Sequence, residues 1–309
     1  MTLILLVCAT IALMTVVSGV YLFVFGCVRR KELPWLVEEE IRKTPYKEFS
    51  KHIQSANVWL AEHDAEDVWI TSCDGLKLHA LWIPARDPKG TMLLAHGYRS
   101  CPLLDFGLAL EFYHEKGLNL LVPDQRAHGK SEGRYITFGV KESTDVRKWI
   151  EFHNGRFDRI PMILSGLSMG ASTVLYLADK CLPDNVRGII ADCGFTSPKD
   201  ILSSVFRSVT HLPAMPSVVI AEICARCFAG FSLWECDTRH SLSAARIPVL
   251  MIHGNEDGFV PCDMSRQGYE ACTGEKQLLI VEGADHGVSY LVDPDRYKEI
   301  VNSFLDKKL

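Results

Sequence analysis

One short segment, residues 166–170 (Gly-Leu-Ser-Met-Gly), most constrains how this chain can fold. An apolar run at residues 161–164 precedes it, and residues 171–178 follow with a helix-like composition. A serine on so sharp a strand-to-helix turn takes a strained backbone conformation, and side chains two residues to either side would collide with neighbouring backbone. The turn lifts the Ser168 hydroxyl clear of the sheet, where free N–H groups of the helix start point at it.

The first 28 residues form an apolar stretch without Asp, Glu, Lys, Arg, His or Pro. About 20 apolar residues in a helix span a bilayer, so residues 1–28 are predicted to be a transmembrane helix. Arg29, Arg30 and Lys31 follow directly, which by the positive-inside rule places the rest of the chain in the cytoplasm. A cleaved signal peptide would have a basic start and a shorter apolar core. The sequence therefore favours an uncleaved, single-pass anchor in the cell membrane over export.

Composition restricts the classes of function. With 309 residues, 48% of them apolar, and a net charge of -5, the chain has an ample core and no basic footprint for nucleic acid. Its eleven cysteines lack the spacing of a disulfide framework and indicate free thiols. A zinc ion could use Cys224, Cys227, Cys236 and His240, but small apolar residues on a helix face are the simpler interpretation. We expect neither a metal nor an organic cofactor.

The rest of the chain divides into a linker and one domain. Residues 29–67 are charged and mixed, and Phe49, Ile53 and residues 58–60 loosely mark an amphipathic helix that we expect to pack on its own domain or on the membrane. The domain, residues 68–309, begins with a hairpin around Asp74-Gly75. Apolar runs then alternate with helical periods, at residues 92–95, 118–122, 162–164, 188–191, 249–252 and 277–281. This alternation predicts a mostly parallel sheet with helices on both faces.

Residues that follow the strands of such a sheet gather at one edge. His96-Gly97 follows the third strand, residues 124–131 (Asp-Gln-Arg-Ala-His-Gly-Lys-Ser) the fourth, and Ser168 the fifth. Asp192, Asp257 and His286 follow the sixth, seventh and eighth. Several motifs in this order resemble the α/β-hydrolase superfamily, over about residues 68–305, and the chain order Ser, Asp, His is the one this fold uses. The resemblance implies an eight-stranded α/β-hydrolase fold with a lid, as in esterases and serine aminopeptidases.

The same resemblance implies a catalytic triad. A serine hydroxyl is a poor nucleophile until an imidazole takes its proton, which His286 would do for Ser168. Asp257 would hold the other ring nitrogen and stabilise the imidazolium. The backbone N–H groups of Tyr98 and Met169 would hold the oxyanion.

Alternatives exist for the acid. Asp192 competes because some members of the fold place the acid after the sixth strand, and Glu256 is a nearer rival. The spacing His-Gly-x-x-Asp favours Asp257. His96 and His128 are interpreted as structural residues that shape loops through hydrogen bonds to the backbone.

An insertion at about residues 196–246, between the sixth and seventh strands, is too long for a plain connection. Its apolar residues recur at helical spacing, and Pro213 and Pro216 interrupt them. The resemblance implies a helical lid here, and an apolar lid favours an apolar acyl group.

The sequence thus predicts a membrane-anchored serine hydrolase that cleaves a small-molecule carboxylic ester. A serine aminopeptidase or amidase and an acyltransferase that uses the same acyl-enzyme are the alternative enzymes. A non-catalytic scaffold on this fold is disfavoured because no member of the triad is missing, although fold alone does not establish function. Substrate identity and oligomeric state stay open.

Overall fold

Eight strands form one sheet in the order β1-β2-β4-β3-β5-β6-β7-β8 in the computed structural model, which describes residues 2–30, 58–157 and 159–309. β2 is antiparallel to both of its neighbours, and the remaining pairs are parallel. Each predicted apolar run lies in a strand, so the predicted α/β-hydrolase fold class is confirmed. The strands are β1 (Glu66–Thr71), β2 (Lys77–Ile83), β3 (Gly90–Ala95), β4 (Leu118–Pro123), β5 (Met162–Leu167), β6 (Val186–Asp192), β7 (Val249–Gly254) and β8 (Lys276–Val281).

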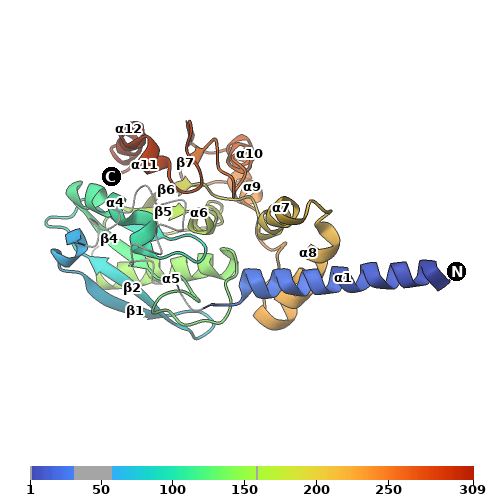
Figure 1. Ribbon diagram of the computed structural model, residues 1–309. Coiled ribbons are helices and arrows are strands. Elements are labelled where there is room, and N and C mark those ends of the chain that lie inside the picture. The colour runs from blue at the N-terminus through green and yellow to red at the C-terminus, as the bar shows by residue number, and fades with distance from the viewer. Residues whose placement is uncertain (1, 31–57, 158) are drawn as a thin grey trace.

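Helices cover both faces of this sheet (Figure 1). α4 and α12 pack on one face, and α5, α6 and α9 pack on the other. Outside the N-terminal helix and the lid, the helices are α4 (Pro102–Glu115), α5 (Val140–Arg156), α6 (Met169–Leu175), α10 (Asp263–Ala271), α11 (Ser289–Val292) and α12 (Pro294–Leu305).

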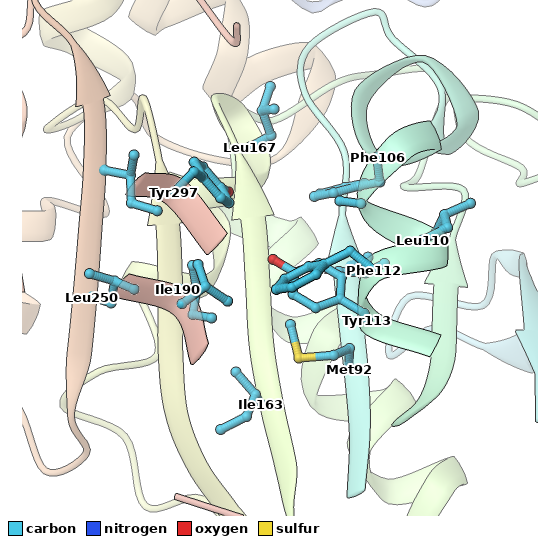
Figure 2. Close-up of a cluster of buried hydrophobic side chains, with 14 of the residues drawn as sticks. Met92, Phe106, Leu110, Phe112, Tyr113, Ile163, Leu167, Ile190, Leu250 and Tyr297 are labelled. Atoms are coloured by element: carbon cyan, nitrogen blue, oxygen red, sulfur yellow. The ribbon is translucent and has the colours of Figure 1, made fainter. Parts of the chain in front are cut away.

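The first of the two faces shows how the core is built (Figure 2). Met92, Ile163, Ile190 and Leu250 come from four successive strands of the sheet and lie beneath aromatic and aliphatic side chains of α4 and α12. All four are fully buried. Because parallel strands covered on both faces need apolar residues throughout, these strands read as continuous apolar runs in the sequence.

The turn between β5 and α6 has the strained geometry that the sequence predicts. Ser168 has φ 55° and ψ −114°, outside the regions that L-residues favour. A Cβ atom on Gly170 would lie 1.8 Å from the carbonyl oxygen of Ala95, and one on Gly166 would lie 2.2 Å from the backbone of Gly170. Gly170 is therefore required because the start of α6 crosses directly over the end of β3, and Gly166 is required because it lies against the first turn of α6.

The N-terminal helix α1 (Thr2–Cys27) is the one helix among the described residues that is long and apolar enough to cross a membrane. Most of it projects away from the domain, and its last third packs on α8 (Met215–Cys224), a helix of the insertion between β6 and β7 (Figure 1). At the crossing, a Cβ on Gly19 would lie 2.4 Å from Cβ of Ile220, and the hydroxyls of Ser18 and Ser217 are 2.7 Å apart. Small residues thus permit close contact between the two helices.

The insertion between β6 and β7 is helical, as predicted. It contains α7 (Pro198–Thr210), α8 (Met215–Cys224), a π-helical turn (Ala225–Ala229) and α9 (Thr238–Ser243). Pro216 lies in the first turn of α8, where a proline is tolerated. We call residues 196–246 the lid segment.

The predicted amphipathic helix of the linker falls largely outside the described residues, including Phe49 and Ile53. Trp59 and Leu60 are described, and they pack against the core cluster shared by α4 and α12. This contact agrees with packing on the domain. The division into anchor, linker and domain stays a prediction.

The crossing of β3 and α6 predicts the effect of one methyl group. Gly170→Ala should lower the free energy of unfolding by at least about 3 kcal/mol, because the added Cβ would overlap a backbone carbonyl that cannot move aside. Urea unfolding in detergent micelles measures this loss. Gly155→Ala is the matched control, because a Cβ atom at this exposed position of α5 would meet nothing within 4 Å. Alanine favours the helix over glycine, so this substitution should raise the free energy of unfolding by up to about 1 kcal/mol. Equal effects of the two substitutions would contradict the steric argument.

Candidate active site

The structure brings Ser168, His286 and Asp257 together, although they follow three different strands. Nε2 of His286 lies 2.9 Å from Oγ of Ser168, and Nδ1 lies 2.7 Å from Oδ2 of Asp257. The Ser168 side chain is buried at the start of α6, and His286 is partly exposed. With Nδ1–H donating to the carboxylate, the free Nε2 can accept the serine proton. The arrangement can thus generate a serine nucleophile.

Asp257 is surrounded by hydrogen-bond donors. Its side chain is fully buried, and besides His286 it accepts from Nε2 of His253 at 3.1 Å and from the backbone N–H groups of Phe259 and Val260. Burial acts to raise the pKa of this carboxyl, but the hydrogen bonds from His253 and His286 outweigh burial and hold the pKa well below its usual range. Asp257 is therefore ionised at neutral pH, as a partner of an imidazolium must be.

The two rival carboxyl groups differ in surroundings. Burial raises the pKa of Asp192 to about 7, against the opposing effects of His253 and Ser289. Asp192 is thus largely protonated below neutral pH, and its side chain contacts the Ser289 hydroxyl at 3.3 Å rather than His286. Glu256 is exposed to solvent. The geometry favours Asp257 as the partner of His286 over both rivals.

Two backbone amides lie free beside Ser168. Within the described residues, neither the Tyr98 N–H nor the Met169 N–H has a hydrogen-bond acceptor. Met169 opens α6, where the first N–H groups of a helix have no intrahelical partner. These are the two amides that the resemblance assigns to the oxyanion hole.

The loop after β3 is fixed on both sides of Tyr98. The Gly97 N–H donates to the buried carboxyl of Asp105 at 2.6 Å, and the Arg99 N–H donates to Nε2 of His128 at 3.0 Å. His128 in turn donates from Nδ1 to the carbonyl of Arg126. Burial, followed by the neighbouring His96, lowers the pKa of His128 to about 3, so its ring is neutral and can accept.

His96 performs a similar role. Its Nδ1 donates to the Gly97 carbonyl at 2.8 Å, and its Nε2 accepts from the Gln125 N–H at 3.0 Å. The interpretation of His96 and His128 as loop-shaping residues is confirmed.

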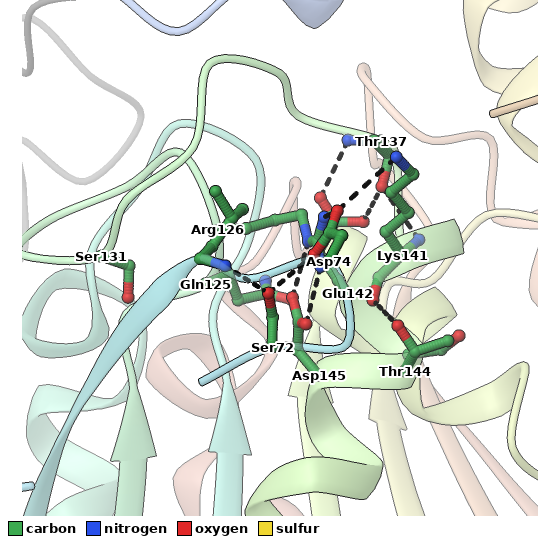
Figure 3. Close-up of polar contacts among 12 residues, drawn as sticks. Ser72, Asp74, Gln125, Arg126, Ser131, Thr137, Lys141, Glu142, Thr144 and Asp145 are labelled. Atoms are coloured by element: carbon green, nitrogen blue, oxygen red, sulfur yellow. Dashed lines mark hydrogen bonds and ion pairs between the residues drawn. The ribbon is translucent and has the colours of Figure 1, made fainter. Parts of the chain in front are cut away.

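A buried ion-pair network supports the loop that carries His128 (Figure 3). The Arg126 guanidinium, almost wholly buried, pairs with Asp145 of α5 at 2.6 Å and with Asp74 of the β1–β2 turn at 2.9 Å. Glu142 accepts from the N–H groups of Thr137 and Gly139 and so caps the start of α5. Because a buried guanidinium is strongly destabilising when unpaired, the network locks turn, loop and helix together.

The cysteines are free thiols throughout the described part of the chain. The four residues considered for zinc, Cys224, Cys227, Cys236 and His240, do not form a group that could share an ion among the described residues. A group close enough to do so consists of Cys193, Asp257 and His286. Burial raises the pKa of the Cys193 thiol far above its usual range, which opposes the thiolate form that binds metals.

Sequence reasoning missed the supporting residues of this site. His253 belongs to the His-Gly-x-x-Asp motif, but its hydrogen bond to Asp257 was not anticipated. Asp105 and Phe259, whose ring lies 5.1 Å from that of His286, carry no signal in the sequence.

This chain is similar in sequence to a known family and to several known proteins. A family model described as serine aminopeptidase, S33, matches residues 86–220. YqkD of Bacillus subtilis is 28% identical over 238 residues, which cover 77% of this chain and 78% of that protein. A yeast protein named as a membrane protein, YNL320W of Saccharomyces cerevisiae, is 24% identical over 79% of this chain and 80% of its own length.

Two solved esterases are similar in structure. The esterase Pf2001 of Pyrococcus furiosus has a TM-score of 0.65 and 23% identity, covering 80% of this chain and 92% of the esterase. The esterase EaEST of Exiguobacterium antarcticum has a TM-score of 0.58 and 17% identity, covering 78% and 100%. The sheet order, the elbow and the family match agree: the chain has the α/β-hydrolase fold and is similar to proteins of that superfamily.

Proposed function

We propose that the chain is a serine hydrolase that cleaves carboxylic esters through an acyl-enzyme on Ser168. The observation that carries this proposal is the hydrogen-bonded series from Ser168 through His286 to Asp257, at 2.9 and 2.7 Å. A strained serine, an imidazole nitrogen within hydrogen-bond distance of its hydroxyl and a buried ionised carboxylate have no evident structural purpose in this combination.

The geometry supports a definite order of steps. Oγ of Ser168 attacks the ester carbonyl while Nε2 of His286 takes its proton, and the Tyr98 and Met169 N–H groups hold the resulting oxyanion. His286 then returns the proton to the leaving alcohol. Water repeats the sequence on the acyl-enzyme and releases the acid.

An apolar acyl group is supported by the side chains beside the serine. Met169 belongs to an apolar cluster with Phe138 and Phe195, together with residues of α7 and α8. Burial of apolar acyl carbons against such side chains gives about 25 cal/mol per Å² of area removed from water.

The family model favours a second candidate, a serine aminopeptidase. Such an enzyme needs a free carboxylate for the substrate's amine, and three of the four lid carboxylates are already paired with arginines. The fourth, Glu235, is exposed and accepts from the Ser232 N–H. Asp200 and Asp237 both accept from Arg239, and Glu222 accepts from Arg226 and from the Leu233 N–H. This pairing supports ester over aminopeptide cleavage.

A paired substrate panel tests the proposal. We expect p-nitrophenyl esters to be hydrolysed with a maximum at one acyl length, and aminoacyl p-nitroanilides to be hydrolysed slowly. Ser168→Ala and His286→Ala should each lower kcat by about 10⁶-fold, because each removes the nucleophile or its base. Initial rates in detergent micelles are the measurement. Faster cleavage of the anilides would support the aminopeptidase, and ester cleavage that survives Ser168→Ala would refute the mechanism.

The choice of acid is tested by two asparagine variants. Asp257→Asn should lower kcat by about 10⁴-fold, because the amide cannot stabilise the imidazolium or hold its tautomer. Asp192→Asn is the matched control and should change kcat less than about threefold, since the amide resembles the protonated carboxyl already present near pH 7. The measurement is kcat of both variants on the p-nitrophenyl ester that the wild type hydrolyses fastest. A large loss in Asp192→Asn alone would place the acid after β6.

We also propose that α1 anchors the enzyme in a membrane with the catalytic domain on the cytoplasmic face. The helix has 26 residues, or about 39 Å, against a hydrocarbon core of about 30 Å. Arg29 and Arg30 follow its C-terminal end, as the positive-inside rule requires. The lid adds exposed apolar side chains beside α1, including Val219, Ile223 and Phe228. Such residues suit a surface that rests on lipid.

Two native cysteines test this topology. Cys73, in the turn between β1 and β2, and Cys181, between α6 and β6, are both exposed to solvent. A membrane-impermeant maleimide should label both only after the cells are permeabilised, and the protein should stay with membranes in alkaline carbonate. Labelling in intact cells would place the domain outside, and release by carbonate would exclude a spanning helix.

A further inference from the structure

The end of the membrane helix meets the loop that carries the proposed oxyanion hole. The Tyr98 hydroxyl donates to the carbonyl oxygens of Phe25 at 3.1 Å and Gly26 at 3.0 Å. The Arg99 guanidinium donates to the same Phe25 carbonyl and to that of Val28 at 3.1 Å. The last carbonyls of a helix have no intrahelical partner, so two neighbouring side chains of one loop cap the end of α1.

The adjoining loop holds the helix end from another side. The Ile136 N–H donates to the Cys27 carbonyl at 2.7 Å, and the Arg29 N–H donates to the Arg134 carbonyl at 2.8 Å. Val28 and Tyr135 form an isolated β-bridge. The helix end is therefore built into the domain by backbone hydrogen bonds, and its position relative to the sheet is set.

The Tyr98 ring is clamped as well as its hydroxyl. It stacks on Phe138 with ring centroids 5.5 Å apart and an interplanar angle of 12°. A Cβ on Gly26 would lie 3.3 Å from both Phe138 and Leu202 of α7, so α1 packs directly against this pair. Tyr98 is thereby held between the end of α1 and the Phe138 ring.

One residue thus joins the anchor to the reacting centre. The backbone N–H of Tyr98 is the donor that the proposed mechanism uses, and the side chain of Tyr98 is what α1 holds. The loop is fixed at Gly97 by Asp105 and at Arg99 by His128. The peptide that carries the Tyr98 N–H is also held through the Gly97 carbonyl, which accepts from Nδ1 of His96 at 2.8 Å. The side-chain contacts with α1 add a further restraint, on the Tyr98 side of this peptide.

We propose that the last turn of α1 is a positioning element of the oxyanion hole, so that hydrolysis depends on the docked membrane helix and not only on the soluble domain. This inference rests on the proposed ester hydrolysis. Oxyanion donors act only when they are held within a few tenths of an ångström of the developing charge. Loss of the hydrogen bonds between the end of α1 and Tyr98 should therefore lower kcat, while substrate binding persists.

The test is Tyr98→Phe in the full chain in detergent micelles. This change removes the hydroxyl that reaches α1 and keeps the ring and the backbone N–H. We expect kcat on the best ester to fall about 10-fold, short of the ~10²–10³ that loss of a whole donor causes, with KM changed less than about twofold.

Tyr135→Phe is the matched control. Tyr135 also contacts α1, through the Phe23 ring 5.8 Å away, but it lies outside the oxyanion loop. We expect kcat to be unchanged by this substitution. Tyr135→Phe keeps the ring contact and removes a hydroxyl near α1 that, within the described residues, has no hydrogen bond to the oxyanion loop. If it lowered kcat as much as Tyr98→Phe, the bond from Tyr98 to α1 would not be the cause, and the proposal would be overturned.

An alkyl trifluoromethyl ketone supplies a readout that a merely structural role would not move. Oγ of Ser168 adds to its carbonyl carbon, the proton passes to His286, and the former carbonyl oxygen becomes an oxyanion in the same hole. Its inhibition constant should rise in Tyr98→Phe by the factor by which kcat/KM falls. An inhibition constant and kcat within twofold of the wild type would refute the proposal.

Arg99→Lys is the second variant, in case Tyr98→Phe folds poorly. A lysine keeps the charge but cannot bridge two carbonyls as the guanidinium does, so the same change in kcat and inhibition constant is expected. If kcat and the inhibition constant of Arg99→Lys both equalled the wild-type values, the proposal would again be overturned. Failure of the proposed function is a separate result, because the wild-type chain itself would then show no Ser168-dependent ester cleavage.

Discussion

The crossing of α6 over the end of β3 is the contact on which the site depends. With no room for a Cβ between Gly170 and the Ala95 carbonyl, the helix start lies directly on the sheet edge. That approach places the Met169 N–H beside the loop that follows β3, where the Tyr98 N–H also lies free. Strain such as that of Ser168 costs of order 1–3 kcal/mol, and a core of fully buried strands on both sides can hold it.

Hydrogen-bond donors, and not burial, determine which of the two carboxyl groups, Asp192 or Asp257, is ionised. Asp192 and Asp257 follow adjacent strands, and burial acts to raise the pKa of both. Asp257 receives two imidazole and two backbone donors and stays ionised, whereas Asp192 keeps a pKa raised to about 7. At neutral pH the same edge of one sheet thus holds one ionised carboxyl group and one that is partly protonated, and of these two only Asp257 contacts His286.

The features of the fold and of the site that depend on local sequence patterns could be predicted from the sequence. The strands appear as apolar runs, the elbow needs its two glycines, and the order of motifs after the strands follows from the parallel topology. The supporting contacts could not be predicted, because they depend on how the chain turns after a strand or on the packing of distant segments. The His253 bond to Asp257 depends on how β7 ends, and the Asp105 bond to Gly97 depends on the start of α4. The packing of Gly19 on Ile220 links residues about 200 positions apart, and no periodicity records it.

The N-terminal helix has two chemically different ends, and each has its own partner. Its outer part exposes apolar side chains such as Leu3, Ile11 and Val17, which water solvates poorly and lipid solvates well. Its inner end presents carbonyl groups that must find donors, and the donors come from Tyr98 and Arg99. If the outer part is held in lipid, as proposed, the same continuous helix also fixes the distance of the proposed oxyanion loop from the membrane. A flexible tether would leave the position of the proposed oxyanion loop independent of the membrane. A helix whose end is capped by that loop couples the two positions.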